Sequence, residues 1–308
     1  MTAVESRPFG CASAPHITVV GDAGLDITAL LTGPLAHGHD TRARISTAPG
    51  GSGANTAAWL AHSRVPVTLI SRVGDDDAGR SLRTVLGNDG VDCAFAVDPA
   101  LPTCQVIVLV GPDGDRTMVP DRGANAALSP ADIVLPTTAG PSHLHLSGYV
   151  LLDNGSRPAG LAALAAAADR GWTTSVDPQA ASHLAARDPG EFLSWVDGVD
   201  LLLPNEAELA ALGGVDAALH HVGTVAVTRA GTGAAWIDRR RTLELPAPAV
   251  RQVDATGAGD AFDAGLLAAW VDGADADDAL RAGIAAGSAA VTVIGGQPPT
   301  WRSGDPRR

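Results

Sequence analysis

Short β-rich runs alternate with helical patterns along most of this chain, and that alternation restricts the fold more than any other feature. The β-rich runs cover residues 16–20, 67–71, 143–146, 173–176, 200–203 and 224–228. The helical patterns cover residues 54–62, 77–86, 156–168, 206–212 and 258–271. Strands that alternate with helices imply right-handed crossovers. The sequence therefore predicts an α/β fold with a doubly wound, mostly parallel sheet flanked by helices.

Two stretches, at about residues 27–48 and 101–122, break this alternation. In the second stretch, residues 104–110 and 115–119 flank the turn Gly111-Pro112-Asp113-Gly114, which is typical of a hairpin. Both stretches are interpreted as antiparallel ribbons that form a small β lid, inserted in one domain covering residues 1–308. Such inserts often close over a substrate, although a purely structural flap has the same pattern.

Composition and charge exclude several classes of protein. The 308 residues are 45% hydrophobic, which is enough for a large core, and the net charge of -13 disfavours nucleic acid as a partner. No run of apolar residues is long enough to predict a membrane span. Cys11, Cys93 and Cys104 are odd in number and widely spaced, so neither a disulfide framework nor a zinc site is predicted. We therefore expect a protein of the reducing cytoplasm.

The sequence contains no lysine, so every fixed cation is an arginine. This absence excludes P-loop NTPases, protein kinases of the eukaryotic type and pyridoxal-phosphate enzymes, because each of these needs a particular lysine. A Rossmann dehydrogenase is also disfavoured. Gly21-Asp22-Ala23-Gly24 follows the first predicted strand, where a dinucleotide-binding protein has Gly-x-Gly-x-x-Gly.

The segment from Asp254 to Phe262 carries the strongest chemical signal. Its small residues stand at the start of a predicted helix, where exposed backbone N–H groups and the helix dipole form a hole for anionic oxygens. Gly257, Ala258 and Gly259 are the candidate residues of this anion hole. Asp260, in the first helical turn, is the candidate base for a hydroxyl that attacks a phosphoryl group. In an isolated Gly-x-Gly-Asp, an acidic residue that only stabilises the helix would look the same.

Two signatures together resemble those of the PfkB family of carbohydrate kinases. The string Asp254-Ala255-Thr256-Gly257-Ala258-Gly259-Asp260-Ala261-Phe262 is similar to the C-terminal signature of that family. Gly50-Gly51-Ser52-Gly53-Ala54-Asn55-Thr56-Ala57 is similar to its N-terminal signature, and the two stand in the family's order about two hundred residues apart. The resemblance extends from about residue 16 to residue 300. It implies a ribokinase-like fold and an ATP-dependent kinase that phosphorylates a sugar-type hydroxyl.

The resemblance also implies a role for each part of the site. The implied ligands of the sugar hydroxyls are Asp26, Gly51 and Asn55, and the implied ATP-binding residues are Asn205, Thr228, Gly231 and Gly233. Glu208 is expected to hold Mg²⁺ through water, because magnesium keeps much of its hydration shell. Family members often bind an activating K⁺, for which the matching residues are Asp254, Thr256, Ala290, Val293 and Gly295, with Pro299 where the family has a serine. A homodimer formed through the lid is also implied.

Departures from the family pattern bear on the substrate. Ser52 stands where ribokinases have a lysine, and Ser147 stands near the position of a ribose-binding glutamate, so ribose is disfavoured. A phosphorylated sugar is disfavoured further, although Arg116 or Arg122 could hold its phosphate. We therefore predict a neutral or acidic monosaccharide, such as a keto-deoxy acid, as the acceptor.

Two alternatives remain open, and a histidine metal site is disfavoured. A nucleoside kinase of the same fold would need an aromatic wall, and aromatic residues are only 4% of the chain, although Phe95, Tyr149 or Trp172 could line the pocket. A sugar-binding regulator would have no use for Asp260. His143 and His145, which alternate on a predicted strand, have the spacing of a two-histidine metal edge but lack a third ligand in the sequence.

Overall fold

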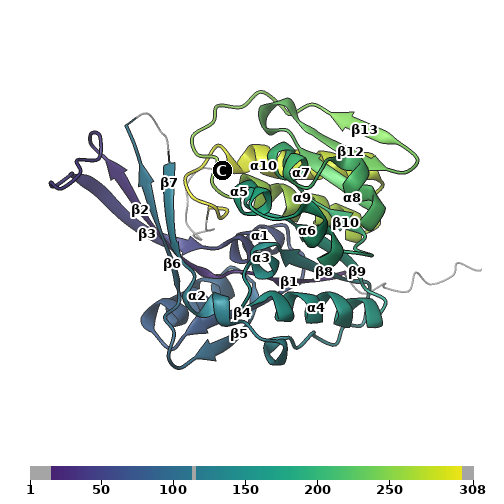
Figure 1. Ribbon diagram of the computed structural model, residues 1–308, viewed down its shortest axis with the longest axis horizontal. Coiled ribbons are helices and arrows are strands. Elements are labelled where there is room, and N and C mark those ends of the chain that lie inside the picture. Colours follow the sequence, from purple (N-terminus) through teal and green to yellow (C-terminus); the bar gives the residue numbers. More distant parts are fainter. Residues whose placement is uncertain (1–14, 113–115, 300–308) are drawn as a thin grey trace, which may run out of the picture.

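A nine-stranded sheet forms the centre of the computed structural model, which describes residues 15–112 and 116–299 (Figure 1). Its strand order is β13-β12-β11-β10-β9-β8-β1-β4-β5. The seven strands from β11 to β5 are parallel, and the hairpin of β12 and β13 extends one edge in antiparallel pairing. The strands are β1 (His16–Val20), β4 (Val67–Gly74), β5 (Asp92–Asp98), β8 (Ser142–Ser147), β9 (Thr173–Asp177), β10 (Leu201–Leu202), β11 (Thr224–Thr228), β12 (Ala234–Asp238) and β13 (Thr242–Leu245).

Helices cover both faces of this sheet, so the prediction of a doubly wound α/β fold is confirmed. One core lies beneath α1 (Ser52–His62), α2 (Asp77–Asn88), α9 (Ala258–Val271) and α10 (Ala276–Ala290). The other lies beneath α3 (Tyr149–Leu152), α4 (Arg157–Asp169), α5 (Ala181–Ala185), α6 (Pro189–Trp195), α7 (Glu206–Ala211) and α8 (Val215–His221). Most strands are buried on both faces, as expected for a parallel sheet between two helical layers.

A separate four-stranded sheet, here called the small sheet, projects from one side of the main body (Figure 1). It consists of β2 (Gly24–Leu31), β3 (Ala43–Gly50), β6 (Cys104–Val110) and β7 (Arg116–Asp121) in the order β3-β2-β6-β7. The two predicted ribbons therefore pair with each other through the parallel strands β2 and β6. The small sheet begins at Gly24 rather than residue 27, so Asp26 lies on a strand. Cys11, the turn residues Asp113 and Gly114, and Asp115 of the second predicted strand lie outside the described residues.

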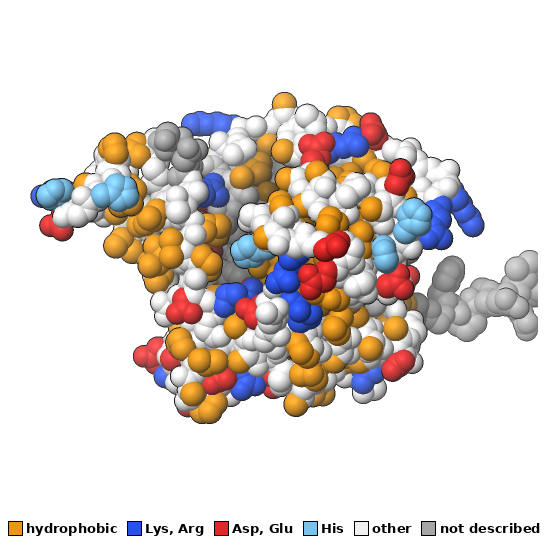
Figure 2. Space-filling model, in the orientation of Figure 1, with side chains coloured by type: hydrophobic (Ala, Val, Ile, Leu, Met, Phe, Trp, Pro, Cys, Tyr) orange, Lys and Arg blue, Asp and Glu red, His pale blue; other side chains and the backbone are white. Residues whose placement is uncertain are grey.

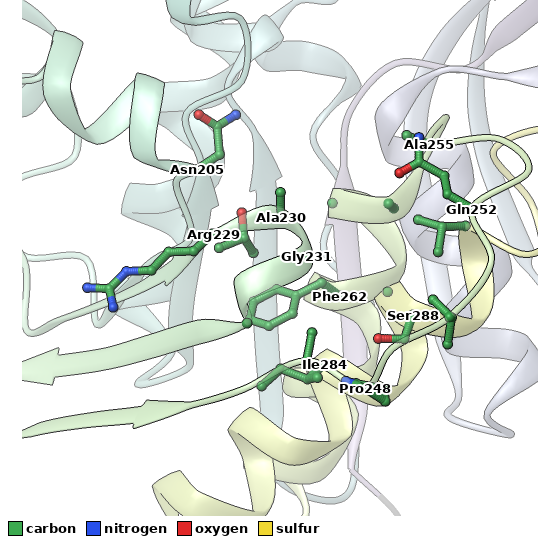
Figure 3. Close-up of a pocket in the computed structure, with 18 of the residues that line it drawn as sticks. Asn205, Arg229, Ala230, Gly231, Pro248, Gln252, Ala255, Phe262, Ile284 and Ser288 are labelled. Carbon is green, nitrogen blue, oxygen red and sulfur yellow. The ribbon is translucent and has the colours of Figure 1, made fainter. Parts of the chain in front are cut away.

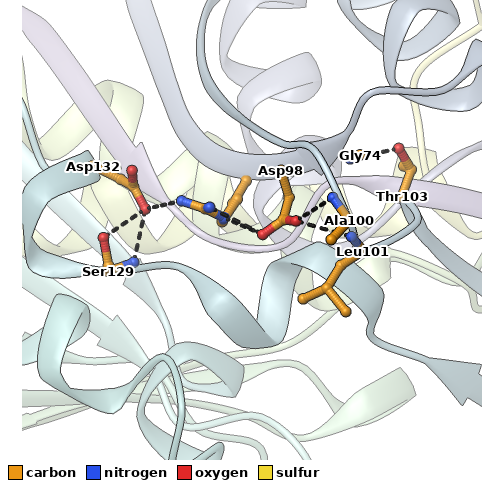
Figure 4. Close-up of polar contacts among 8 residues, drawn as sticks. Gly74, Asp98, Ala100, Leu101, Thr103, Ser129 and Asp132 are labelled. Atoms are coloured by element: carbon orange, nitrogen blue, oxygen red, sulfur yellow. Dashed lines mark hydrogen bonds and ion pairs between the residues drawn. The ribbon is translucent and has the colours of Figure 1, made fainter.

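An arginine on β4 links the main sheet to the segments on either side of the small sheet (Figure 4). The Arg72 guanidinium group contacts Asp98 at the end of β5 at 3.0 Å and Asp132 at 2.9 Å. Asp98 in turn accepts hydrogen bonds from the amides of Ala100 and Leu101, at the start of the chain that leads into β6. These contacts fix the entry to the small sheet relative to the carboxyl ends of the parallel strands.

The sequence did not predict β5, the β12–β13 hairpin or α10. The helix α10 packs against α9 over small residues, because a Cβ atom at Gly265 would lie 2.6 Å from the Ala282 carbonyl oxygen. This close packing fixes α9, which begins at the predicted anion hole. None of the helices within residues 15–112 and 116–299 has the length and apolarity of a membrane span.

Candidate active site

The N-terminus of α9 has the backbone geometry that the sequence predicts for an anion hole. Gly257 is its N-cap in the left-handed region, with φ of 69°, and a Cβ atom there would lie 2.5 Å from the Gly296 Cα atom. The amides of Gly259 and Asp260 lie in the first turn, where the helix offers N–H groups no partner of its own. The Ala258 amide instead donates to the Ala255 carbonyl at 3.3 Å, so the hole depends on the other amides.

Asp260 is buried in the first turn of α9 and is held by two side chains of α1. Its Oδ1 atom accepts a hydrogen bond from Ser52 Oγ at 2.8 Å, and its Oδ2 atom accepts one from Asn55 Nδ2 at 2.9 Å. Gln179 Nε2, after β9, donates to Ser52 Oγ at 2.6 Å. Burial raises the pKa of Asp260 to about 6, against these hydrogen bonds, which lower it. The carboxylate is thus positioned and ionised near neutral pH.

The other predicted sugar-binding residues lie beside Asp260. Asp26, on β2, is close enough for its charge to raise the pKa of Asp260, and burial raises the pKa of Asp26 itself to about 6. Gly51, the N-cap of α1, has φ of 94°, and a Cβ atom there would meet the Asp22 carbonyl oxygen at 2.6 Å. Asn55 Oδ1 is buried without a hydrogen-bond partner and is free to accept one from a ligand. These residues come from the small sheet and from α1.

A cavity of about 630 Å³ opens beside the anion hole (Figure 3). It is lined by the predicted ATP-binding residues Asn205, Thr228, Gly231 and Gly233, and by Ala258 and Gly259 of the anion hole. Phe262, Ile284 and Val291 form part of an apolar wall. Its volume and mostly apolar lining suit a nucleotide base and ribose.

A second cavity, of about 190 Å³, lies next to the first at the N-terminus of α9, and the two share lining residues. Asn205, Thr228 and Gly259 line both cavities, whereas Asp260 lines only the smaller one. A phosphate chain that ran from the larger cavity to the smaller one would therefore pass the α9 N-terminus and end at Asp260.

The smaller cavity also contains two acidic residues that the sequence analysis missed. Asp177 ends β9, and Asp263 lies one turn after Asp260 on α9; both are buried. Burial raises the pKa of each carboxyl well above its usual range, and the neighbouring Glu208 and Asp260 raise it further. Two signals were available: the carboxyl end of a parallel strand is a common ligand site, and i,i+3 spacing puts Asp263 near the face of Asp260.

The predicted magnesium residues form a capping box at the start of α7. Asn205 Oδ1 accepts from the Glu208 amide at 2.9 Å, and Glu208 accepts from the Asn205 amide at 2.8 Å and from its Nδ2 at 2.6 Å. Glu208 lines the smaller cavity. Among the described residues, no group of three or more His, Cys, Asp or Glu side chains has the arrangement of a metal site. The Glu208 carboxylate, held by Asn205, would fit a Mg²⁺ ion bound through water.

The residues predicted for K⁺ come together, but their carboxylate is already paired. Asp254 Oδ1 accepts from the Thr256 amide at 2.8 Å, and Oδ2 accepts from the Gly295 amide at 3.0 Å. Arg116, on β7, lies 2.5 Å from Asp254 Oδ1. The Ala290 carbonyl accepts from the Val293 amide at 3.2 Å. These residues do not fit a monovalent cation, because a guanidinium group holds the one anionic ligand.

Arg122 and the aromatic residues considered for substrate binding are likewise engaged. Arg122 contacts Asp22 at 3.0 Å and stands over the ring of Tyr149 at 5.6 Å. Phe95 is part of the core beneath α1 and α2, and the Arg83 guanidinium group lies over its ring. Trp172 packs against the other core, and the Arg170 guanidinium group lies over its ring. Phe95 and Trp172 are therefore structural residues.

His143 and His145 do not form a metal edge with any third ligand in the described chain. Both are fully buried, and both contact Ser175 Oγ, at 2.8 and 2.9 Å. Burial lowers the pKa of both imidazoles, that of His145 to about 3. They are neutral residues of the core between β8 and β9.

Known proteins match this chain over nearly its whole length. A family model described as pfkB family carbohydrate kinase matches residues 14–302. An ATP-dependent ribose-1-phosphate kinase from Halopiger xanaduensis is 36% identical over 247 residues, which are 78% of this chain and 79% of that protein.

Two solved structures are similar at 25% identity. A putative ribokinase II from E. coli, in complex with ATP and Mg²⁺, has a TM-score of 0.81 and covers 91% of this chain and 94% of its own. A fructokinase double mutant from Vibrio cholerae O395, with fructose, ADP and a potassium ion bound, has a TM-score of 0.76 and covers 93% of this chain and 95% of its own. The match spans both signatures and every element that builds the site, and it shows that this protein belongs to the pfkB family of carbohydrate kinases.

Proposed function

We propose that the ATP-dependent sugar kinase activity of this family is carried out here with Asp260 as the base. Asp260 takes the proton of the acceptor hydroxyl, the oxygen then attacks the γ-phosphorus of ATP, and ADP leaves. The amides of Gly259 and Asp260 stabilise the charge on the transferring phosphoryl oxygens. The position of Asp260, between Asp26 and the α9 N-terminus at the end of the smaller cavity, carries this proposal.

We infer that ATP occupies the larger cavity, with Asn205, Thr228, Gly231 and Gly233 around it. Mg²⁺, held through water at Glu208, would neutralise phosphate charge during transfer. The cation has a clear purpose in this chain, because Asp177, Glu208, Asp260 and Asp263 line the smaller cavity and no arginine is among the described residues that line it. Phosphate anions would otherwise meet acidic side chains.

The proposed acceptor is a neutral or acidic monosaccharide. Arg116 and Arg122, the two arginines named for a substrate phosphate, each already pair with a carboxylate. The ring of Tyr149 cannot stack on a nucleoside base, because the Arg122 guanidinium group covers it. Ser52, which stands where ribokinases have a lysine, donates a hydrogen bond to Asp260 and brings no positive charge to the sugar site. The name of the Halopiger relative makes ribose 1-phosphate the competing acceptor.

A panel of acceptors, measured by ADP release with Mg²⁺, tests this assignment. We expect a neutral sugar to give the highest kcat/KM, because it needs no free arginine, and a keto-deoxy acid is tested beside it. Ribose 1-phosphate and nucleosides are included as competitors. A higher kcat/KM with either of them would contradict the proposed acceptor class, and no ADP release with any acceptor would favour a sugar-binding regulator.

The pH dependence of kcat/KM should reflect the titration of two carboxylates, Asp26 and Asp260. Because burial raises the pKa of both Asp26 and Asp260 to about 6, and both must be ionised, kcat/KM should fall as the pH drops through 6. The limiting slope of log kcat/KM against pH should approach about 2, since the two groups titrate together. In Asp26→Asn the residual activity should show a slope of about 1. A flat profile from about pH 8 to pH 5 would be inconsistent with this site.

We propose that the small sheet also forms a homodimer interface. Its face opposite Asp26 carries Ile45, Ile107 and Val119, which are 67%, 45% and 52% exposed, and Figure 2 shows hydrophobic side chains gathered over this sheet. Light scattering should give twice the 31.0 kDa mass of one chain. Ile107→Asp should be monomeric, while Val134→Asp, at an exposed site outside the small sheet, should not change the mass. A monomeric wild-type protein would exclude the interface.

The chain is proposed to act as one kinase domain with the small sheet as its lid, in the cytoplasm. Cys93 and Cys104 are both free in the described residues, and burial raises their pKa to about 11 and 12. Unpaired, protonated thiols and the use of ATP are consistent with a reducing compartment. Recovery of the protein from a secreted or periplasmic fraction would contradict this location.

A further inference from the structure

Arg116 extends from the small sheet to the loop that leads into the anion hole. Its Nη2 atom lies 2.5 Å from Asp254 Oδ1, and its Nη1 atom donates to Thr256 Oγ1. The two side chains of the ion pair are only 26% and 15% exposed. On β7, Arg116 shares a face of the small sheet with Asp26, so both side chains project from the sheet toward the site.

Asp254 joins the two loops that shape the α9 N-terminus. One oxygen accepts from the Thr256 amide and the other from the Gly295 amide, on the loop after α10. The next residue of that loop, Gly296, packs against Gly257. A partly buried carboxylate in this position needs a positive partner, because desolvation makes an unpaired charge costly.

We propose that Arg116 is a positioning residue that supplies the fixed positive charge at Asp254, so that phosphoryl transfer here needs no monovalent cation. This inference rests on the site assignment proposed above. Arg116 fills both roles that a bound cation would have: it neutralises Asp254 and it fixes the Thr256 side chain beside Gly257. Pro299, which has no hydroxyl group, removes a further ligand for such an ion. Because β7 carries the charge, the loop is complete only when the small sheet covers the site.

The test compares chloride salts in buffers free of sodium and potassium. Wild-type kcat should be the same in KCl and in tetramethylammonium chloride of equal ionic strength. Arg116→Ala should lower kcat roughly tenfold or more in tetramethylammonium chloride, because the anion hole loses its support. KCl or dilute guanidinium chloride should restore much of this loss with saturation, and the KM for ATP should change less than kcat.

Thermal unfolding gives a second measurement that does not depend on activity. KCl should raise the Tm of Arg116→Ala, because an ion that binds the vacated site stabilises the folded state, and it should leave the wild-type Tm unchanged. Arg116→Lys, which keeps a cation, should stay independent of potassium. Arg44→Ala is the matched control, because it removes an exposed arginine from β3, at the opposite edge of the same sheet.

Three results would overturn the proposal: activation of the wild type by K⁺, wild-type kcat for Arg116→Ala without K⁺, or a loss in a folded Arg116→Ala that neither cation relieves. If Arg116→Ala does not fold, the wild-type salt series and Arg116→Lys still decide the matter. Failure of the kinase assignment is distinguishable, since the wild type would then release no ADP in any salt.

Discussion

Asp260→Asn is expected to lower kcat by roughly 10²–10⁴-fold, the usual effect of losing a general base. Sugar and ATP affinities should remain near the wild-type values. An asparagine has nearly the same shape as an aspartate. Its side-chain oxygen can still accept a hydrogen bond from Asn55 Nδ2, and its side-chain nitrogen can donate one to Ser52 Oγ, so both contacts with α1 are preserved. Steady-state kinetics and calorimetric titration with each substrate measure the two effects separately.

The matched control for this variant is Asp272→Asn, which makes the same substitution at the exposed C-cap of the same helix. Its kcat should equal that of the wild type. If Asp260→Asn kept more than about a tenth of wild-type kcat, Asp260 would not be the base. A parallel loss of sugar binding would instead make Asp260 chiefly a ligand of the acceptor.

Gly257→Ala is expected to have the second largest effect. A side chain at this position is strained by the φ of 69°, and its Cβ atom would lie 2.5 Å from the Gly296 Cα atom, which is backbone and cannot rotate away. The α9 N-terminus and the loop around Gly296 must separate, so the amides of Gly259 and Asp260 lose their alignment. We expect kcat to fall by roughly 10²-fold or more, as for the loss of an oxyanion-hole donor.

Gly171→Ala separates the effect of backbone strain from the effect of this steric clash. Gly171 has φ of 68°, nearly that of Gly257, but no atom lies within 4 Å of its Cβ position. The Gly171→Ala variant should therefore lose only about 1–2 kcal/mol of unfolding free energy, from the strain of an alanine in the left-handed region, and its kcat should not change. Chemical denaturation and initial rates compare the two variants. Equal kcat values for Gly257→Ala and Gly171→Ala would contradict the role of Gly257 in the anion hole.

The sequence predicted the fold class, and it indicated the proposed base, because both depend on local patterns. The alternation of strand and helix indicated the doubly wound sheet, and the small residues before Asp260 indicated an anion hole, since a helix start and its glycines are consecutive in the chain. The elements at the edges of the fold were harder to predict from the sequence. β5 lies at the edge of the main sheet, and α10 is an alanine-rich helix whose role depends on its packing against Gly265.

The departures from the family pattern became interpretable only with the fold. Ser52 looked like the loss of a substrate contact, but in the structure it binds Asp260, 208 residues away, and receives a hydrogen bond from Gln179. Phe95 and Trp172 were considered for a nucleoside pocket and belong to the two cores. A residue type at one position does not reveal which face of an element it occupies until the neighbours are placed.

The sequence by itself determined the α/β architecture and the family resemblance, and it indicated the helix start proposed as the anion hole, because helix starts, turns and strand periods are set by residues close in the chain. The tertiary structure alone decided that Asp177 and Asp263 share the smaller cavity with Asp260, and that Arg116 pairs with Asp254. Those contacts join segments that are distant in sequence. Strand order, register and the closure of the small sheet bring them together, and no local pattern encodes these.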